Sequence, residues 1–424
     1  MPWWRRKINS CGRKTATGFM CASLLSTVAL GGNAEQTFEF KFYGSNIFPW
    51  IDGSKSGLVT DEKGDMANGL ERMMASSTRY LDAAVYGINA QDWFFQQLAN
   101  LKNSDVRVRT VVDQMSGFLG EWEPHNFAYR DTVKLVDTIG EAAIQVDVGR
   151  DGNPRAGSIM HNKFVVADNT SVWMGSTNIS STGLGAEYNA NTSLEIKSPK
   201  LARIYSGEFR KMFSLNQFSL YKNPRSNRTP LTYGDGTEVS VFFSPQDNTL
   251  EAAVLPFIDS TQHRLAIGMF YLTDHRIVAA LVRAQNRGVD VRLIYDGLAA
   301  SHPSSKIREL RAAGVNVRIE NWGGKMHMKT AIADSKNVLI GSMNWSMSGS
   351  RTNDENTLII KNNRKLARSV TIYFNKLWKT LDNAANMPDP RAESLSSINS
   401  CFDGIDNNHN GLVDAEEPSC SNSY

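Results

Sequence analysis

The sequence predicts an α/β protein made of two similar domains in tandem. The first observation is a spacing pattern that occurs twice: histidine, lysine at +2, aspartate at +7, Gly-Ser at +14 and +15, and asparagine at +17. The two copies begin at His161 and His327. The second observation is that each copy follows a similar series of apolar and amphipathic segments. Because this repeat is far longer than a solenoid repeat, it indicates two fused domains.

The first domain is predicted to span residues 35–222. Alternating apolar and polar residues indicate strands, and apolar residues at helical spacing indicate helices. The predicted elements are, in order, a strand at 37–42, a helix at 65–80, a strand at 81–86, a helix at 92–101 and a strand at 106–113. A strand-helix-strand unit of this length is a right-handed crossover, so we expect a largely parallel sheet that helices cover.

The second domain is predicted to span residues 237–381, after a polar joint at 223–236 that contains prolines and glycines. Asp296 ends one of its strands where Asp113 ends the matching strand of the first domain. The predicted elements are a strand at 239–243, a helix at 250–260, a strand at 265–271, a helix at 275–287, a strand at 289–296 and a helix at 365–380.

Each copy of the repeated pattern is predicted to form a β-hairpin. In the first copy, a strand at 160–167 is followed by a turn at 169–171 and a returning strand at 172–176. Since side chains alternate along a strand, His161 and Lys163 should point to the same face.

The other polar residues of each copy take their positions from the same hairpin. Asn178 follows the returning strand, which brings it back towards the histidine and the lysine. Asp168 falls on the opposite face by the same alternation. We therefore predict that Asp168 and its counterpart Asp334 support the hairpins and do not react.

The side chains that each hairpin presents suit a phosphate diester. Lysine and asparagine can donate to the non-bridging oxygens and stabilise charge that develops in the transition state. Histidine can attack phosphorus or protonate the leaving oxygen near neutral pH. The lysines supply the positive charge, so we expect no cofactor for catalysis. The predicted catalytic residues are His161, Lys163, Asn178, His327, Lys329 and Asn344.

The doubled His-x-Lys-x4-Asp motif with its Gly-Ser-x-Asn resembles the phospholipase D superfamily, over roughly residues 40–380. The resemblance implies two α/β sandwich domains around a pseudo-two-fold axis, with the site at their interface. It also implies a phosphohistidine intermediate formed without a metal. His161 is the implied nucleophile and His327 the implied general acid, and the reverse assignment stays open.

Glu355 resembles the acidic residue of this family that steadies a catalytic histidine, and we include it among the catalytic residues. Matching the two halves puts Asn191 where Glu355 falls. Glu187 and Glu195 are the alternatives in the first half. The two histidines are therefore predicted to lie in unequal environments, consistent with unequal roles.

The first 34 residues are predicted to be a cleaved export signal. Residues 1–34 carry five basic residues and no acidic one, and the apolar run at 19–30 is too short to span a bilayer. The alternative is an uncleaved membrane anchor. Export predicts a secreted or periplasmic protein, in which Cys401 and Cys420 should form a disulfide.

A linker at 382–400 is predicted to lead into a calcium-loop module at 401–420. Twelve residues from Asp406 to Glu417 match the calcium-loop pattern, with Gly411 at its sixth position. The module resembles short disulfide-closed calcium modules of some exported bacterial proteins. A solvated acidic tail is the alternative. The predicted Ca²⁺ ligands are Asp406, Asn408, Asn410, the carbonyl of Leu412, Asp414 and Glu417.

We predict a secreted phospholipase D, acting as a monomer at a membrane surface on phospholipid headgroup bonds. The segment at 117–127 mixes glycine with large apolar residues, which suits a loop over the site or a lipid-touching lip, or a loop packed on its own domain. The alternative is a nuclease acting on DNA, although the chain between its two charged ends is nearly neutral and nucleic acid is a less favoured partner. A catalytically idle binding protein is a third possibility, which two intact motifs disfavour.

Overall fold

The computed structural model describes residues 37–114, 129–148, 158–224, 229–381 and 389–421. The predicted export signal and the segment at 117–127 lie outside these residues. Within the described ranges, no helix combines the length and apolar character needed to cross a membrane.

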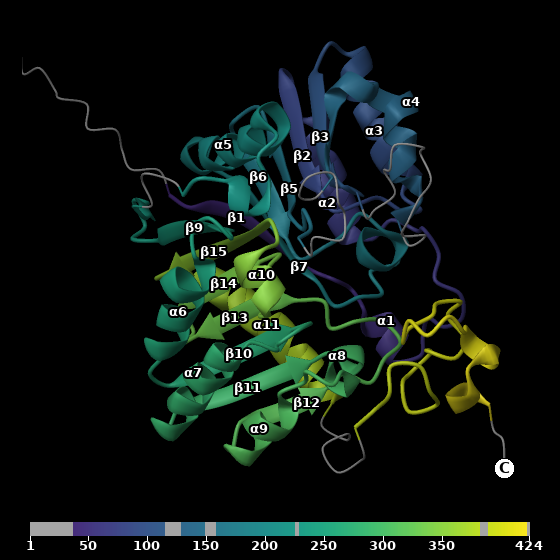
Figure 1. The fold of residues 1–424 in the computed structure, drawn as a ribbon, viewed down its shortest axis with the longest axis vertical. Helices are drawn as coiled ribbons and strands as arrows, with labels where there is room; N and C mark the ends of the chain where they lie inside the picture. Colours follow the sequence, from purple (N-terminus) through teal and green to yellow (C-terminus); the bar gives the residue numbers. More distant parts are fainter. Residues whose placement is uncertain (1–36, 115–128, 149–157, 225–228, 382–388, 422–424) are drawn as a thin grey trace, which may run out of the picture. The chain divides into compact units, whose positions relative to one another are not determined.

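The first half of the chain forms a seven-stranded sheet in the order β1-β7-β6-β5-β2-β3-β4 (Figure 1). Its strands are β1 (Glu39–Gly44), β2 (Tyr80–Val85), β3 (Arg107–Asp113), β4 (Ile144–Asp147), β5 (Lys163–Ala167), β6 (Ser171–Gly175) and β7 (Thr192–Lys197). Its helices are α1 (Phe48–Ile51), α2 (Asp65–Ala75), α3 (Asp92–Asn103), α4 (Leu135–Ile139) and α5 (Pro199–Leu215).

The second half forms an eight-stranded sheet in the order β12-β11-β10-β13-β14-β15-β9-β8. Its strands are β8 (Leu231–Thr232), β9 (Glu238–Ser244), β10 (Arg264–Met269), β11 (Asp290–Tyr295), β12 (Asn316–Ile319), β13 (Lys329–Ala333), β14 (Asn337–Gly341) and β15 (Glu355–Lys361). Its α-helices are α6 (Leu255–Asp259), α7 (His275–Asn286), α8 (Gly297–Ser301), α9 (Ile307–Ala312), α10 (Met347–Arg351) and α11 (Arg364–Thr380).

The two sheets share one strand order, which accords with the predicted duplication. Read from β4 to β1, the first sheet matches the second read from β12 to β9. In each sheet three strands are parallel, such as β2, β3 and β4, and the rest are antiparallel. The expectation of a largely parallel sheet is therefore wrong. The reason is that each motif hairpin and the strand after it pair through short antiparallel connections.

Most predicted elements are present with shifted ends. The helix predicted at 65–80 ends at Ala75, because the strand β2 already begins at Tyr80. The helix predicted at 250–260 divides into a π-helical turn, Leu250–Val254, and α6. The strand predicted at 160–167 begins only at Lys163.

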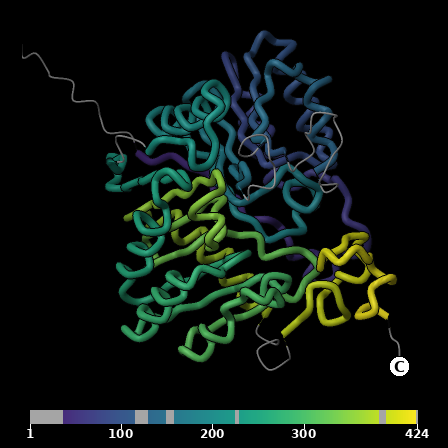
Figure 2. Tube along the Cα trace, in the orientation of Figure 1, coloured from purple at the N-terminus to yellow at the C-terminus, as the bar shows by residue number. Residues whose placement is uncertain are grey.

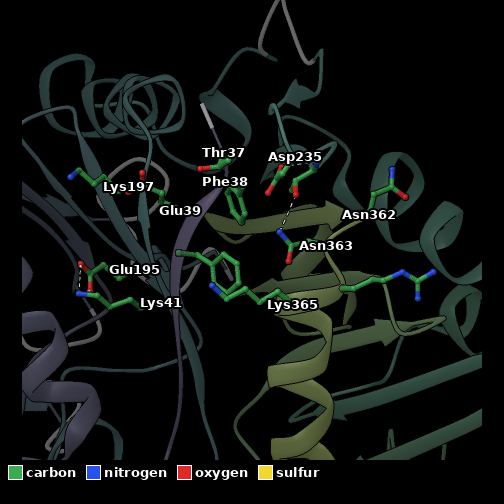
Figure 3. Close-up of a pocket in the computed structure, with 13 residues that line it drawn as sticks. Thr37, Phe38, Glu39, Lys41, Glu195, Lys197, Asp235, Asn362, Asn363 and Lys365 are labelled. Atoms are coloured by element: carbon green, nitrogen blue, oxygen red, sulfur yellow. Dashed lines mark hydrogen bonds and ion pairs between the residues drawn. The ribbon is translucent and has the colours of Figure 1, made fainter. Parts of the chain in front are cut away.

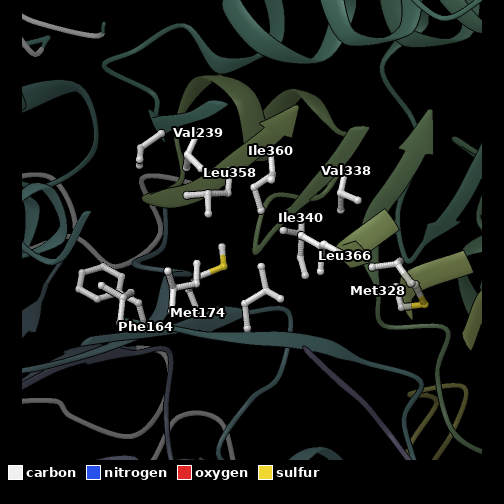
Figure 4. Close-up of a cluster of buried hydrophobic side chains, with 14 of the residues drawn as sticks. Phe164, Met174, Val239, Met328, Val338, Ile340, Leu358, Ile360 and Leu366 are labelled. Carbon is white, nitrogen blue, oxygen red and sulfur yellow. The ribbon is translucent and has the colours of Figure 1, made fainter. Parts of the chain in front are cut away.

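A shared hydrophobic core joins the two halves. Figure 4 shows Phe164 and Met174 of the first sheet opposite Leu358 and Ile360 of the second, and all four are buried. The long helices α5 and α11 add their apolar faces to the same cluster. Because one core serves both sheets, the halves fold as parts of one body, which fixes their motifs relative to each other.

The C-terminal module, defined as residues 389–421, is closed by the Cys401–Cys420 disulfide, whose Cα atoms are 5.4 Å apart. Figure 2 shows it in yellow as a compact group of loops. The described part of the predicted linker is packed into this module. Glu393 is buried, and its carboxylate accepts the N–H groups of Asn407 (3.0 Å) and Asp414 (2.9 Å). Residues 389–400 therefore do not form an open connection.

Candidate active site

The first motif gathers its histidine and lysine around one aromatic ring. His161 lies just before β5, and its ring packs edge-on against Tyr86, with centroids 5.6 Å apart. The ammonium of Lys163 lies 5.6 Å from the same ring and donates to the carbonyl oxygen of His161 at 2.7 Å. The two side chains therefore share one side of the sheet, as predicted.

The second motif repeats this arrangement around Phe270, which follows β10 as Tyr86 follows β2. The rings of Phe270 and His327 have centroids 5.1 Å apart, and Lys329 Nζ lies 4.9 Å from the Phe270 centroid. Lys329 donates to the carbonyl oxygen of His327 at 2.8 Å. The repeated motif does not include these aromatic residues, although each directly follows one of two equivalent strands.

Each histidine is held by a residue from the other half of the chain. His161 Nδ1 lies 2.8 Å from Glu355 Oε1, and His327 Nδ1 lies 2.9 Å from Asn191 Oδ1. The serine of each Gly-Ser pair holds the partner in place: Ser342 Oγ donates to Glu355 at 2.6 Å, and Ser176 Oγ donates to Asn191 at 2.8 Å.

The two alternatives to Asn191 are wrong, because both glutamates are engaged elsewhere. Glu187 accepts the backbone N–H groups of Asn46 and Met66. Glu195 bonds to Lys41 and Tyr43 at the sheet surface. The match between Asn191 and Glu355 was available from the sequence, but the crossing of the pairs between halves was not.

Burial dominates the electrostatics of the site. The four residues His161, Lys163, His327 and Lys329 are each at most 8% exposed. Burial lowers the pKa of His161 to about 4, even though the neighbouring Glu355 carboxylate opposes that shift. Burial likewise lowers the pKa of Lys163 to about 7.

The second set is shifted in the same direction. Burial first, and then Lys329 and Lys163, lower the pKa of His327 well below its usual value. Burial and Lys163 do the same to the pKa of Lys329. The two sets are therefore close enough to repel each other's charges, and an anion bound between them would relieve that repulsion.

The two motif asparagines occupy equivalent positions with acceptor atoms that lack partners. Asn178 Nδ2 donates to the hydroxyl of Tyr129 at 2.7 Å, and the Tyr129 ring packs edge-on against Tyr86. Among the described residues, the Oδ1 atoms of Asn178 and Asn344 are buried without a hydrogen-bond partner. Both oxygens are therefore free to accept a hydrogen bond beside the motif histidines and lysines.

Asp168 and Asp334 lie at the far ends of β5 and β13 from the histidines. The Asp168 carboxylate accepts the N–H groups of residues 78–80, and the Asp334 carboxylate accepts those of residues 262–264. Each aspartate thus connects its hairpin turn by hydrogen bonds to the start of the neighbouring strand, β2 for Asp168 and β10 for Asp334.

A second pair of aspartates, which the repeated motif does not include, supports the histidines. Asp113 accepts the N–H of Met160 at 2.6 Å, and Asp296 accepts the N–H of Met326 at 3.0 Å. Each methionine directly precedes a motif histidine. The signal was present in the sequence, because the two aspartates end matching strands.

The predicted calcium loop has a defined turn. The Asp406 carboxylate accepts the N–H groups of Asn410 (3.1 Å) and Gly411 (2.8 Å), and Gly411 has a φ of +93°. Asn410 Nδ2 donates to Glu417 at 2.6 Å. The Asp414 carboxylate instead accepts N–H groups of residues 403 and 404.

The predicted ligands are therefore only partly gathered. Across the described residues, no three His, Cys, Asp or Glu side chains come together as a metal site. Asn408, Asn410 and the carbonyl of Leu412 would have to supply several of the ligand oxygens.

A surface hollow of about 770 Å³ lies away from both motifs (Figure 3). It is lined by residues of β1, β7, the turn between β8 and β9 and the start of α11, including Lys41, Asp235 and Lys365. Its lining mixes cations with carboxylates and includes none of the motif residues.

Comparisons with known proteins agree on one family. Residues 70–213 and 254–378 match the family model described as cardiolipin synthase, PLD-like domain. A phospholipase D of Rickettsia prowazekii is 31% identical over 179 residues, which cover 42% of this chain and 85% of that protein. The mitochondrial cardiolipin hydrolase of Xenopus tropicalis is 32% identical over 141 residues, 33% of this chain and 67% of that protein.

The match to one of the similar solved structures extends over both halves. That structure is the phosphatidylserine synthase of Haemophilus influenzae, with a TM-score of 0.57 and 14% identity, covering 82% of this chain and 89% of that one. That likeness shows a shared fold, while the family model covers most of the chain. This chain therefore belongs to the phospholipase D superfamily and is a phosphodiesterase of that family.

Proposed function

We propose that this protein is an exported phospholipase D that hydrolyses the headgroup phosphodiester of phospholipids through a phosphohistidine. The observation that carries the proposal is the crossed pair of contacts, His161 with Glu355 and His327 with Asn191. One histidine faces a carboxylate and the other a neutral amide, which suits two different roles in one reaction.

We assign the nucleophile to His161. A hydrogen bond from Nδ1–H to Glu355 leaves the Nε2 lone pair free to attack phosphorus. As the N–P bond forms, the ring gains positive charge, which the buried carboxylate stabilises. The pKa of about 4 keeps His161 neutral before the attack at neutral pH.

We assign the general acid to His327. Its partner Asn191 is neutral and stabilises an imidazolium less than a carboxylate would, so a protonated His327 gives up its proton readily. In the second step, neutral His327 accepts a proton from water as the water oxygen attacks phosphorus. The His161–phosphorus bond then breaks, and His161 is restored.

Lys163, Lys329, Asn178 and Asn344 are proposed to bind the non-bridging oxygens. The lysines are nearly fully buried, so an anion between them is favoured over an empty site. With all reacting groups supplied by the chain, the proposal needs no cofactor for catalysis.

Phospholipid is the proposed substrate class because two similar proteins are named for phospholipase D and cardiolipin hydrolase activities. The basic, then apolar N-terminal sequence supports export to a secreted or periplasmic location. Both motifs lie on one chain, which supports a monomer as the active unit. DNA is the second candidate substrate, on which the same chemistry would run.

Headgroup release from phosphatidylcholine, phosphatidylethanolamine and cardiolipin, alongside cleavage of single- and double-stranded DNA, tests the proposal. We expect lipid turnover that persists in chelator and disappears in His161→Ala, while His275→Ala, a change at an exposed histidine, keeps full activity. Cleavage of DNA alone would contradict the lipid assignment. Activity retained by His161→Ala would contradict the site.

Trapping the intermediate tests the assignment of the two histidines. With a labelled p-nitrophenyl phosphodiester, whose leaving group needs no proton, His327→Ala should accumulate phosphoprotein at His161 because its second step lacks a base. Label on His327 in the His161→Ala protein would reverse the roles.

We also propose that the loop from Asp406 to Glu417 binds Ca²⁺. The turn at Gly411, fastened to the first-position aspartate, supports this proposal. Asp414 would have to turn from the backbone of residues 403 and 404 to join the other ligands. Bound calcium would stabilise the module and take no part in the reaction.

A further inference from the structure

The C-terminal module is hydrogen-bonded to the segment that leads into the second motif. Ile398 N donates to the carbonyl of Asn321 at 2.7 Å, and Gly323 N donates to the carbonyl of Ile398 at 2.7 Å. The side chain of Asn407 donates to the carbonyl of Gly323, also at 2.7 Å. Gly323 lies four residues before His327, and the module therefore binds both its N–H group and its carbonyl oxygen.

The same module holds the segment that carries the partner of His327. The buried hydroxyl of Tyr188 donates to Asp403 Oδ2 at 2.6 Å. Tyr188 also lies tightly on the Gly323-Gly324 pair, where a Cβ on either glycine would overlap it. Glycine is needed at both positions because the two backbones approach so closely.

The two held segments pair with each other and end at the reacting group. Ala190 N donates to the carbonyl of Lys325 at 2.8 Å, and Lys325 N donates to Asn189 Oδ1 at 2.8 Å. Two residues further along each segment, Asn191 bonds to His327. A displacement of the module would thus be transmitted through two short backbone segments to the His327–Asn191 pair.

One side-chain contact links the module to Lys325, a cation whose charge acts on His327. Lys325 Nζ lies 2.6 Å from Nε2 of His409, an exposed residue of the module. Burial lowers the pKa of His327, and Lys325 is one of the cations that add to that effect. His409 therefore fixes the position of a charge that acts on the second motif.

The first half-site is braced by other means. Asp354 N donates to the carbonyl of Ile159, and His161 N donates to the carbonyl of Asp354, both at 2.9 Å. The Asp354 carboxylate is held by Lys222 Nζ at 2.5 Å and by the backbone N–H of Ser219. The C-terminal module thus supports the two segments that carry His327 and its partner Asn191, one from each half, while a buried ion pair supports the backbone beside His161.

We infer that the C-terminal module is a positioning element of the catalytic site, which holds the His327 imidazole where it protonates the leaving oxygen. The inference rests on the proposed role of His327 as general acid. Loosening the module should then impair the step that needs this proton and spare attack on a substrate whose leaving group needs no proton.

Two variants and two substrates test the inference on the full-length protein. Asn407→Ala removes the contact to Gly323, and His409→Ala removes the contact to Lys325 at an exposed position that cannot unfold the core. Phosphatidylcholine has an alkoxide leaving group that needs an acid, whereas bis(p-nitrophenyl) phosphate releases p-nitrophenolate without one. Single-turnover headgroup release and the p-nitrophenolate burst report the first chemical step.

For Asn407→Ala we expect headgroup release to fall between about ten- and a hundred-fold, through kcat and not KM, with the p-nitrophenolate burst within about two-fold of the parent. His409→Ala should change in the same direction by less, and His275→Ala should not change. Equal losses on both substrates, or no loss in His409→Ala, would overturn the inference.

His327→Ala separates this inference from the proposed function. It should lose headgroup release and keep the p-nitrophenolate burst. If His327→Ala loses both equally, the general-acid assignment is wrong. If it shows the split and the module variants do not, the assignment stands and the positioning role of the module is wrong. Thermal unfolding of each variant excludes a simple loss of folded protein.

Discussion

The Glu355 carboxylate lies 2.8 Å from Nδ1 of His161, although the two residues belong to different halves of the chain. The reciprocal contact, from His327 to Asn191, runs in the opposite direction. Neither half therefore contains a complete catalytic unit. The shared core between the sheets has a functional consequence, because any shift of one half against the other would pull both histidines from their partners.

Glu355→Gln should slow formation of the phosphohistidine by roughly 10²–10³-fold, because the amide cannot stabilise the charge that His161 gains. The rate of label transfer to the protein measures this step. Glu195→Gln is a matched control, since Glu195 bonds only at the sheet surface. An unchanged rate in Glu355→Gln would show that His161 is not the nucleophile.

The pH dependence of kcat/KM should have its optimum below pH 6.5. His161 must be neutral, which is satisfied above its pKa of about 4. His327 must be protonated, and its pKa lies well below 6.5 in the free enzyme, so activity falls as pH rises through that value. A profile on a soluble diester that peaks above pH 6.5 would contradict this prediction.

Asn191→Asp should move the alkaline limb of that profile to higher pH. A carboxylate beside His327 favours the charged imidazolium, which raises its pKa and keeps the general acid protonated further into the neutral range. Asn286→Asp, at an exposed position at the end of α7, is the control that adds the same charge away from the site. If the acidic limb moves upward instead, His327 must act unprotonated and is therefore the nucleophile.

The sequence predicted the motif side chains well because their geometry is local. A hairpin sets the positions of His161, Lys163 and Asp168 relative to one another, so spacing alone is informative. The crossing of Glu355 to His161 was not predictable in this way, because it depends on how two sheets pack around one core. The mixture of parallel and antiparallel strands was not predictable for a related reason, since an apolar run does not indicate which neighbour a strand pairs with.

Lys222→Met should destabilise the protein by roughly 3–5 kcal/mol, because it leaves the buried Asp354 carboxylate without its cation and Glu208 with only the longer contact to Lys211 at 3.8 Å. Lys222 Nζ lies 2.5 Å from both Glu208 and Asp354, and all three side chains are at most 1% exposed. The exposed pair of Lys41 and Glu195 offers the control, since Lys41→Met should cost at most about 1 kcal/mol. Denaturant unfolding measures both, and equal losses would contradict the argument.

Calcium should raise the unfolding temperature of the parent protein, with no matching effect of magnesium. At a hundred-fold excess over its Kd, a ligand that binds only the folded state adds about 2.7 kcal/mol to the free energy of unfolding. Asp406→Ala should abolish the shift, because it removes the first ligand and the fastening of the turn at Gly411. Glu416→Gln, beside the loop's last ligand, should keep the calcium-dependent shift.

Asp414→Asn distinguishes two forms of the calcium site. If the shift is lost, Asp414 leaves the backbone of residues 403 and 404 to bind the ion. If the shift is retained, Asp414 stays bonded to that backbone. A parent protein whose unfolding temperature ignores calcium would show that the loop is a structural turn alone.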